Sequence, residues 1–196
     1  MRFAQTLSSQ FWRIHEHAQG YNPTRMAAKV YLSLGSNLGD RLKNLQEGVR
    51  RLRAHGVYPY QISRVYETVP VGETPDPRLY LNLGVWAETE LTPHALLEAV
   101  KTVEAELGRN FTEGRWMPRT LDIDIILYDQ LVLDTPTLTI PHPRMYERAF
   151  VLIPLAETTP NYILPDGTTL QERLNDPQVQ NQEVRVYDAH LSVSSG

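Results

Sequence analysis

Residues 121–128, LDIDIILY, carry the strongest strand pattern in the chain, and they restrict the fold more than any other segment. Side chains alternate between the two faces of a strand, so one face is apolar and holds Leu121, Ile123, Ile125 and Leu127. Asp122 and Asp124 share the opposite face, about 7 Å apart. Asp is a poor strand former. Two of them in so apolar a strand favour a functional role, although a merely solvated face stays open.

The other apolar runs predict a β-α-β-β-α-β order that ends with this strand. Apolar residues spaced by three and four from Leu38 to Leu52 predict a helix, and Thr92-Pro93 is a typical helix start. The expected elements, in order, are strand 30–34, helix 38–52, a strand within 57–66, strand 80–87, helix 93–107 and strand 121–128. This order is typical of the α+β class on the ferredoxin-like plan, with two main helices on one face of the sheet.

Shorter elements are expected after strand 121–128. Residues 131–133 follow the turn pair Asp129-Gln130, which suggests a hairpin with strand 121–128. One or two short helices are expected within 144–157, and another near 169–174.

The length of 196 residues fits a single domain. We expect that domain at 29–184, after a partly disordered N-terminal extension at 1–28 and before a C-terminal tail at 185–196. Cysteine is absent, which excludes a disulfide scaffold and a thiol nucleophile. The net charge of −4 argues against broad nucleic-acid binding, and no apolar stretch is long enough to span a membrane. We therefore expect a cytoplasmic protein with no nucleic-acid or membrane partner.

The paired aspartates lie close to several arginines in the sequence. Arg109, Arg115 and Arg119 come just before them, and Arg144 and Arg148 follow later. Mg²⁺ prefers oxygen ligands such as one or two carboxylates together with substrate phosphates, and guanidinium groups match phosphate oxygens. The pattern therefore indicates a metal and polyphosphate site, with plain Arg–Asp ion pairs as the alternative. The glycines of 35–40 have the wrong spacing for a P-loop, so the nucleotide site must be of a less common kind.

The chain resembles the 6-hydroxymethyl-7,8-dihydropterin pyrophosphokinases of the folate pathway from about Val30 to Gly167. Four segments in order carry the resemblance: LGSNLGD at 34–40, YLN at 80–82, RWMPRTLDID at 115–124, and PHPR at 141–144 leading to RAFVL at 148–152. The third is the most specific.

The resemblance implies a ferredoxin-like core extended into a larger, mainly antiparallel sheet with helices on both faces, in three layers. It implies transfer of pyrophosphate from ATP to the hydroxymethyl group of 6-hydroxymethyl-7,8-dihydropterin, with release of AMP. It also implies two Mg²⁺ ions held by Asp122 and Asp124, which with Arg115 and Arg119 form the expected catalytic set. We expect a monomer whose only partners are these two small substrates.

The resemblance further assigns two sets of binding residues. The ATP-binding set is Glu104, Arg109, Arg115, Trp116, Arg119, Ile125, Thr139, His142 and Arg148. The pterin-binding set is Thr68, Val71, Gly72, Tyr80, Asn82, Trp116 and Phe150. Physical chemistry agrees for part of the second set, because a flat pterin can stack on Tyr80 or Phe150 and its amide edge suits the side chain of Asn82. Core packing is the alternative role for the two aromatic residues.

Three positions depart from the family pattern. Phe111 stands where the family often has Arg, Met117 where Gly is usual, and Val69 where Pro is common. They leave open a catalytically impaired paralogue. A different nucleotide-dependent phosphotransferase and a ferredoxin-like RNA-binding module are further alternatives, but the sequence lacks the exposed aromatic run and basic surface of such a module.

Overall fold

The computed structural model describes residues 27–70, 77–109, 118–189 and 191. The expectations for the extension 1–28 and for Val71, Gly72, Phe111, Arg115, Trp116 and Met117 therefore lie almost wholly outside the described residues. Within the described part of the chain, no helix is both long enough and apolar enough to cross a membrane.

The centre of the fold is an antiparallel sheet in the strand order β5-β1-β4-β3-β8, with β2 also paired to β4. Its strands are β1 (Ala28–Ser36), β2 (Val57–Ile62), β3 (Tyr66–Thr68), β4 (Tyr80–Thr89), β5 (Asp122–Tyr128) and β8 (Val184–Val186). The order β5-β1-β4 with β2 and β3 beyond it confirms the ferredoxin-like plan. The strand expected within 57–66 is two strands, because the pairing with β4 is interrupted between them.

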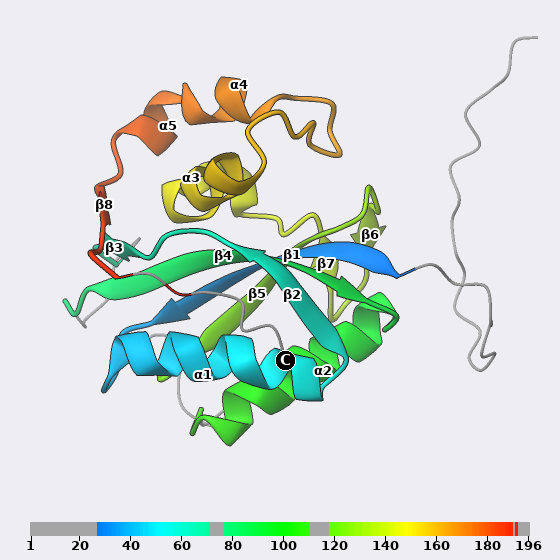
Figure 1. Cartoon of the computed structure of the whole chain (residues 1–196). Coiled ribbons are helices and arrows are strands. Elements are labelled where there is room, and N and C mark those ends of the chain that lie inside the picture. Colours follow the sequence, from blue (N-terminus) through cyan, green and yellow to red (C-terminus); the bar gives the residue numbers. More distant parts are fainter. Residues whose placement is uncertain (1–26, 71–76, 110–117, 190, 192–196) are drawn as a thin grey trace, which may run out of the picture.

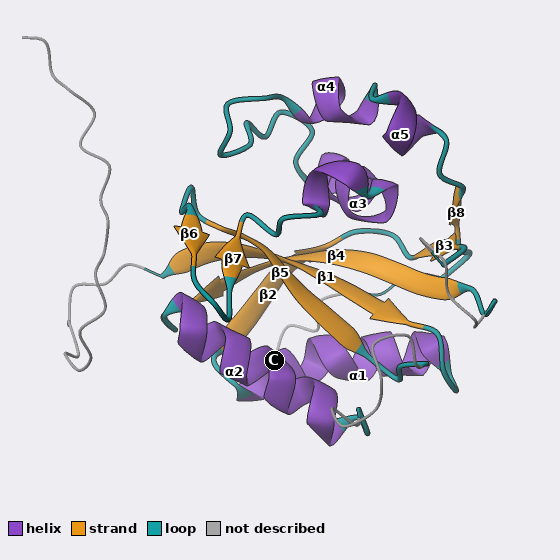
Figure 2. Ribbon diagram, turned by 180° about the vertical axis from the view of Figure 1, so that it is seen from behind, coloured by secondary structure: helices purple, strands orange, loops and turns teal. Residues whose placement is uncertain are grey.

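Helices cover both faces of this sheet, which gives three layers (Figures 1 and 2). One face carries α1 (Arg41–Ala54) and α2 (Pro93–Glu106); the other carries η1 (Met145–Glu147), α3 (Ala149–Thr158), α4 (Leu170–Leu174) and α5 (Pro177–Gln180). The side chain of Asp40 accepts a hydrogen bond from Lys43 N, so α1 begins after Leu38 rather than at it. Thr92 caps α2 in the same way, as the sequence predicts.

The strict alternation expected along β5 ends at a bulge. Ile123 and Ile125 pack in the core beneath α1 and α2, but Ile126 and Leu127 both pack on the α3 side. The cause is the pairing with β1, in which Tyr31 faces Leu127 while Leu32 faces Ile125, so that Ile126 is an extra residue. The prediction that Leu127 shares the apolar face of Leu121 is therefore wrong.

The expected hairpin between β5 and residues 131–133 is also wrong. Strand β6 (Leu133–Asp134) pairs instead with β7 (Thr139–Ile140) in a separate two-stranded sheet. The turn after β5 is held to β1, because Asp129 N donates to Lys29 O and Lys29 N donates to Asp129 Oδ1. These bonds end the sheet at Asp129, whose positive φ of 46° turns the chain away.

The C-terminal part of the chain returns to the sheet. Strand β8 pairs antiparallel with β3, with Val186 opposite Tyr66 and Val184 opposite Thr68. The boundary that was expected between the domain and the C-terminal tail, after residue 184, falls within β8. The short helices expected within 144–157 and near 169–174 are confirmed as η1 with α3, and as α4.

Candidate active site

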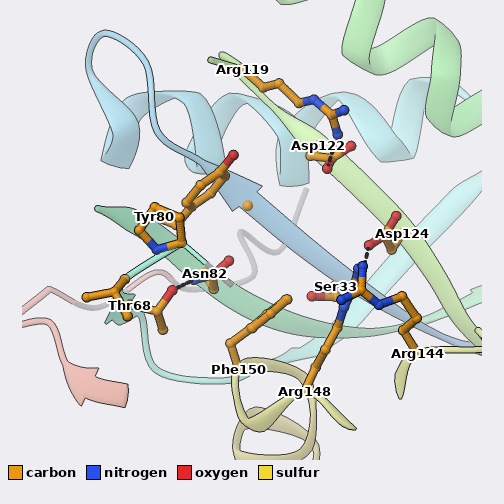
Figure 3. A pocket seen from close by; sticks show the side chains of 13 residues that line it. Ser33, Thr68, Tyr80, Asn82, Arg119, Asp122, Asp124, Arg144, Arg148 and Phe150 are labelled. Atoms are coloured by element: carbon orange, nitrogen blue, oxygen red, sulfur yellow. Dashed lines mark hydrogen bonds and ion pairs between the residues drawn. The ribbon is translucent and has the colours of Figure 1, made fainter. Parts of the chain in front are cut away.

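A pocket opens on the α3 side of the sheet, where strands from distant parts of the sequence lie side by side (Figure 3). It contains both aspartates of β5 and all four of the pterin candidates that lie in the described residues. Its lining residues are Ser33, Gly35, Thr68, Val69, Pro70, Tyr80, Asn82, Arg119, Asp122, Asp124, Arg144, Arg148 and Phe150. We refer to it as the main pocket.

Both carboxylates of the main pocket are paired with arginines. Arg119 Nη1 lies 2.6 Å from Asp122 Oδ2, and Arg109 contacts the other oxygen of that carboxylate. Arg148 Nη1 donates to Asp124 Oδ2 at 3.2 Å. Burial and the neighbouring Asp122 raise the pKa of Asp124, whereas the arginines act in the opposite direction. The site is thus a cluster of opposite charges. The Arg–Asp ion pairs, which the sequence offered as the alternative to a polyphosphate site, are present, and they border a pocket.

Glu104 lies beneath this cluster, on α2, with 2% of its surface exposed. Its Oε1 accepts a hydrogen bond from Ile123 N at 2.6 Å, and its carboxylate contacts Arg109. Burial raises the pKa of Glu104, and Asp122 raises it further. Glu104 was expected at the ATP site. It does not line the main pocket, and it supports the first residues of β5 and the side chain of Arg109.

The opposite end of the pocket is less charged. Asn82 Nδ2 donates to Thr68 Oγ1 at 2.8 Å, and both side chains are buried. Gly35 lies so close that a Cβ there would come within 3.0 Å of Asn82 Oδ1. Phe150 stands across from them, with the Arg148 guanidinium 5.4 Å from its ring centroid (Figure 3). An amide edge and an aromatic face thus border one slot.

The LGSNLGD segment has a structural part in the site that the sequence did not reveal. Arg119 N donates to Asn37 Oδ1 at 2.7 Å, and Asn37 N donates back to Arg119 O at 3.1 Å. Asn44 in turn donates to Leu38 O and Ser36 Oγ. The segment therefore fixes the backbone of Arg119 rather than forming a phosphate loop. The available signal in the sequence was an Asn directly after the end of a strand.

A second hollow lies on the other side of Asp124. It holds the remaining described ATP candidates, Ile125, Thr139 and His142, beside Leu97 and the 135–138 turn. Since Asp124 lines both, one elongated ligand can reach from one hollow to the other. His142 N donates to Ile126 O, and His142 Nδ1 accepts from Arg144 N at 3.1 Å, which leaves the proton on Nε2 of the neutral ring.

His142 should give the protein a pH dependence of stability that can be measured. Burial, and then the charges of Arg148 and Arg144, lower its pKa from 6.5 to about 4. The unfolded chain therefore binds this proton first, and as the pH falls from about 6.5 to about 4 the folded state loses stability. Urea unfolding at pH 7.5 and pH 5 should show a larger loss for the native chain than for His142→Gln. Equal losses in both proteins would contradict this assignment.

The fold is similar to solved HPPK-DHPS structures from Plasmodium falciparum. The wild type with pteroate gives a TM-score of 0.61 and 15% identity over 82% of this chain and 46% of that one. Another wild-type structure gives a TM-score of 0.59 and 15% identity, over 79% of this chain and 45% of that one. The chain thus spans less than half of each, and at this identity only the fold is established. A ferredoxin-like sheet that gathers two carboxylates and several arginines in one pocket has the groups that enzymes of the phosphate-transfer class use.

The sequence comparisons narrow this class. The model of the 7,8-dihydro-6-hydroxymethylpterin-pyrophosphokinase (HPPK) family matches residues 31–160. The 2-amino-4-hydroxy-6-hydroxymethyldihydropteridine pyrophosphokinase of Bacillus subtilis is 48% identical over 129 residues, 65% of this chain and 76% of that protein. The protein of the same name in Methylorubrum extorquens is 44% identical over 147 residues, which are 74% of this chain and 91% of that protein. The chain therefore belongs to the HPPK family, and its role is that of a pterin pyrophosphokinase in folate biosynthesis. The resemblance seen in the sequence is confirmed.

Proposed function

We propose that the chain transfers the pyrophosphoryl group of ATP to the hydroxymethyl oxygen of 6-hydroxymethyl-7,8-dihydropterin, and that the main pocket performs this reaction. One observation carries the proposal: the paired carboxylates of β5, ringed by arginines, share a pocket with the Asn82–Thr68 pair and Phe150. The first half suits a polyphosphate and the second a flat heterocycle with an amide edge. In the reaction an oxygen–β-phosphorus bond forms, the bond between the α-phosphate and β-phosphorus breaks, and AMP leaves.

The donor set fits Mg²⁺. Asp122 and Asp124 offer hard carboxylate oxygens on one face of β5, the ligands that Mg²⁺ prefers. In the described part of the chain no three His, Asp or Glu side chains gather into a metal site, so further ligands would come from phosphate and water. We propose that these two residues hold two Mg²⁺ ions, which neutralise the charge of the polyphosphate when bound.

The arginines position the phosphates. Arg119 has its backbone fixed by Asn37, and its guanidinium lies at the start of β5. Arg148 begins α3 and reaches Asp124 from the other side of the pocket. Both remain charged at any working pH and present paired donors to phosphate oxygens. Positioning and charge neutralisation supply most of the rate enhancement in phosphoryl transfer. Arg115 and Trp116 stay in the proposal as residues near ATP, and Val71, Gly72 and Trp116 as residues near the pterin.

The pterin is held by groups that are already oriented. We place its amide edge against Asn82, whose carboxamide is fixed by Thr68, and its ring between Phe150 and Tyr80. The hydroxymethyl group then faces the aspartates of β5, where Asp122 is the carboxylate that can accept the departing hydroxyl proton. We further propose that the enzyme acts as a monomer in the cytoplasm.

The test of this function separates two products. The full chain is incubated with ATP, Mg²⁺ and 6-hydroxymethyl-7,8-dihydropterin, and the nucleotides are resolved by chromatography. AMP that forms only with the pterin present supports pyrophosphoryl transfer. ADP would mean transfer of a single phosphoryl group, and no turnover despite ATP binding would mean an impaired paralogue.

Replacing Asn82 should weaken the use of the pterin without changing the use of ATP. Asn82→Leu keeps the number and branching of the side-chain heavy atoms but removes the hydrogen-bonding amide, so we expect the KM for the pterin to rise by about 100-fold or more. The KM for ATP should stay within about twofold, because Asn82 lies at the other end of the pocket from Arg119 and Arg148 (Figure 3). Steady-state kinetics with each substrate varied in turn measures both values. A parallel rise of both KM values would show that Asn82 supports the packing of the whole site and does not bind the pterin.

A further inference from the structure

Arg144 is an arginine of the main pocket that belongs to neither of the binding sets assigned by the resemblance. It follows the 141–143 turn, and its side chain lines the main pocket near Arg148 (Figure 3). The turn is held on both sides, because His142 N donates to Ile126 O and Met145 N donates to His142 O. Arg144 N also donates to His142 Nδ1 at 3.1 Å. The backbone that carries Arg144 is therefore tied to β5.

The charge of Arg144 is not offset inside the site. Arg109 and Arg119 pair with Asp122, and Arg148 pairs with Asp124. Within the described ranges, no carboxylate lies within ion-pair distance of Arg144, which is solvent-exposed. Arg144 and Arg148 both line the main pocket, and of these two arginines only Arg148 has an anionic partner among the described residues. This arrangement leaves the main pocket with an uncompensated positive charge at its border with the second hollow.

His142 and Arg144 lie on opposite sides of that border. His142 lines the second hollow, Arg144 lines the main pocket, and Asp124 lines both. We propose that Arg144 is a phosphate-binding residue, which holds the polyphosphate of the nucleotide where it passes from the second hollow into the main pocket. The inference rests on the proposed function, since that function requires a nucleoside triphosphate.

This role differs from that of the paired arginines. Arg148 must share or release Asp124 before it can bind a phosphate, whereas Arg144 has no such bond to break. Arg144 therefore acts mainly on nucleotide affinity. Because it is exposed and carries no ion pair in the described part of the chain, its removal should leave the fold intact.

The experiment measures ATP binding by titration calorimetry, with Mg²⁺ and without pterin, on the full chain. We compare the native protein with Arg144→Ala, Arg144→Lys and the control Arg50→Ala. Arg50 is an exposed α1 arginine paired with Glu47, far from both hollows. We expect the Kd for ATP to rise about tenfold in Arg144→Ala, as for the loss of one charge-assisted contact. Arg144→Lys should recover part of this loss, and Arg50→Ala should match the native protein.

Binding of the pterin substrate to the same proteins separates the possible outcomes. An unchanged pterin Kd in Arg144→Ala, with weaker ATP binding, supports the inference. Equal weakening of both ligands, or unchanged ATP binding, overturns it. Failure of the proposed function is seen separately, because the native protein would then release no AMP in the chromatographic assay.

Discussion

Replacing Asp124 by Asn should lower the rate of AMP release by about a thousandfold. The change removes a charged oxygen ligand from the face of β5 and leaves Arg148 without its carboxylate. Asp122→Asn should have an effect of similar size, because that carboxylate receives both Arg109 and Arg119. The measurement is AMP release by chromatography with both substrates saturating.

A matched control comes from another Asp–Arg pair of the same chain. Asp166 pairs with Arg173 outside both hollows, and its side chain is about as exposed as that of Asp124. Asp166→Asn should keep turnover within about twofold of the native rate. If Asp124→Asn lost only as little of the rate as Asp166→Asn, the carboxylates of β5 would have no part in the proposed reaction.

The largest expected effect on stability comes from Gly84→Ala in the middle of β4. An added Cβ would overlap the hydroxyl and ring of Tyr31, which is fully buried on the neighbouring strand. The backbone of Gly84 cannot move aside easily, because its N–H donates to Ser63 Oγ and its carbonyl accepts from Ser63 N. We expect a loss of at least about 3 kcal/mol in the free energy of unfolding. For a chain of this size that lowers Tm by roughly 6–12 °C.

A double-mutant cycle attributes the loss to that one contact. Tyr31→Leu makes room for the new methyl group, so Gly84→Ala should cost much less in the Tyr31→Leu background than in the native chain. Tyr31→Phe alone should be close to neutral, since the Tyr31 hydroxyl has no hydrogen-bond partner among the described residues. Additive losses in the double variant would show that Gly84 matters for another reason, such as the flexibility of β4.

Local sequence patterns were sufficient for the main elements and for the two aspartates. The start of α2 after Thr92 could be predicted because capping is a property of neighbouring residues, whereas α1 begins after its cap Asp40 and not at Leu38. Asp122 and Asp124 share a face because alternation holds over three residues. Alternation failed at Leu127 because the bulge at Ile126 depends on pairing with β1. The hairpin prediction failed for a related reason, since the turn at Asp129 is fixed by a bond to Lys29, 100 residues away.

The site could be predicted only where chemistry is concentrated in one segment. Arg119, Asp122 and Asp124 stand within six residues of one another, so their joint role is visible in the sequence. Asn37 acts through the backbone of Arg119, and Arg144 faces the pocket because its turn is bonded to Ile126. Neither relation leaves a local pattern. Glu104 shows the converse case, because a charged residue on a helix does not reveal that its carboxylate lies buried beneath β5.

The pairing of β3 with β8 affects when the enzyme can become active during its synthesis. Thr68, which forms the pterin wall with Asn82, stands opposite Val184. More than a hundred residues must leave the ribosome after Thr68 before its strand gains that neighbour. Pairings across such long separations form slowly, because the intervening chain must close a large loop. We therefore expect a nascent chain that stops before Val184 to hold β3 through β4 alone, so that the strand of the pterin wall gains its second neighbour only when synthesis is nearly complete.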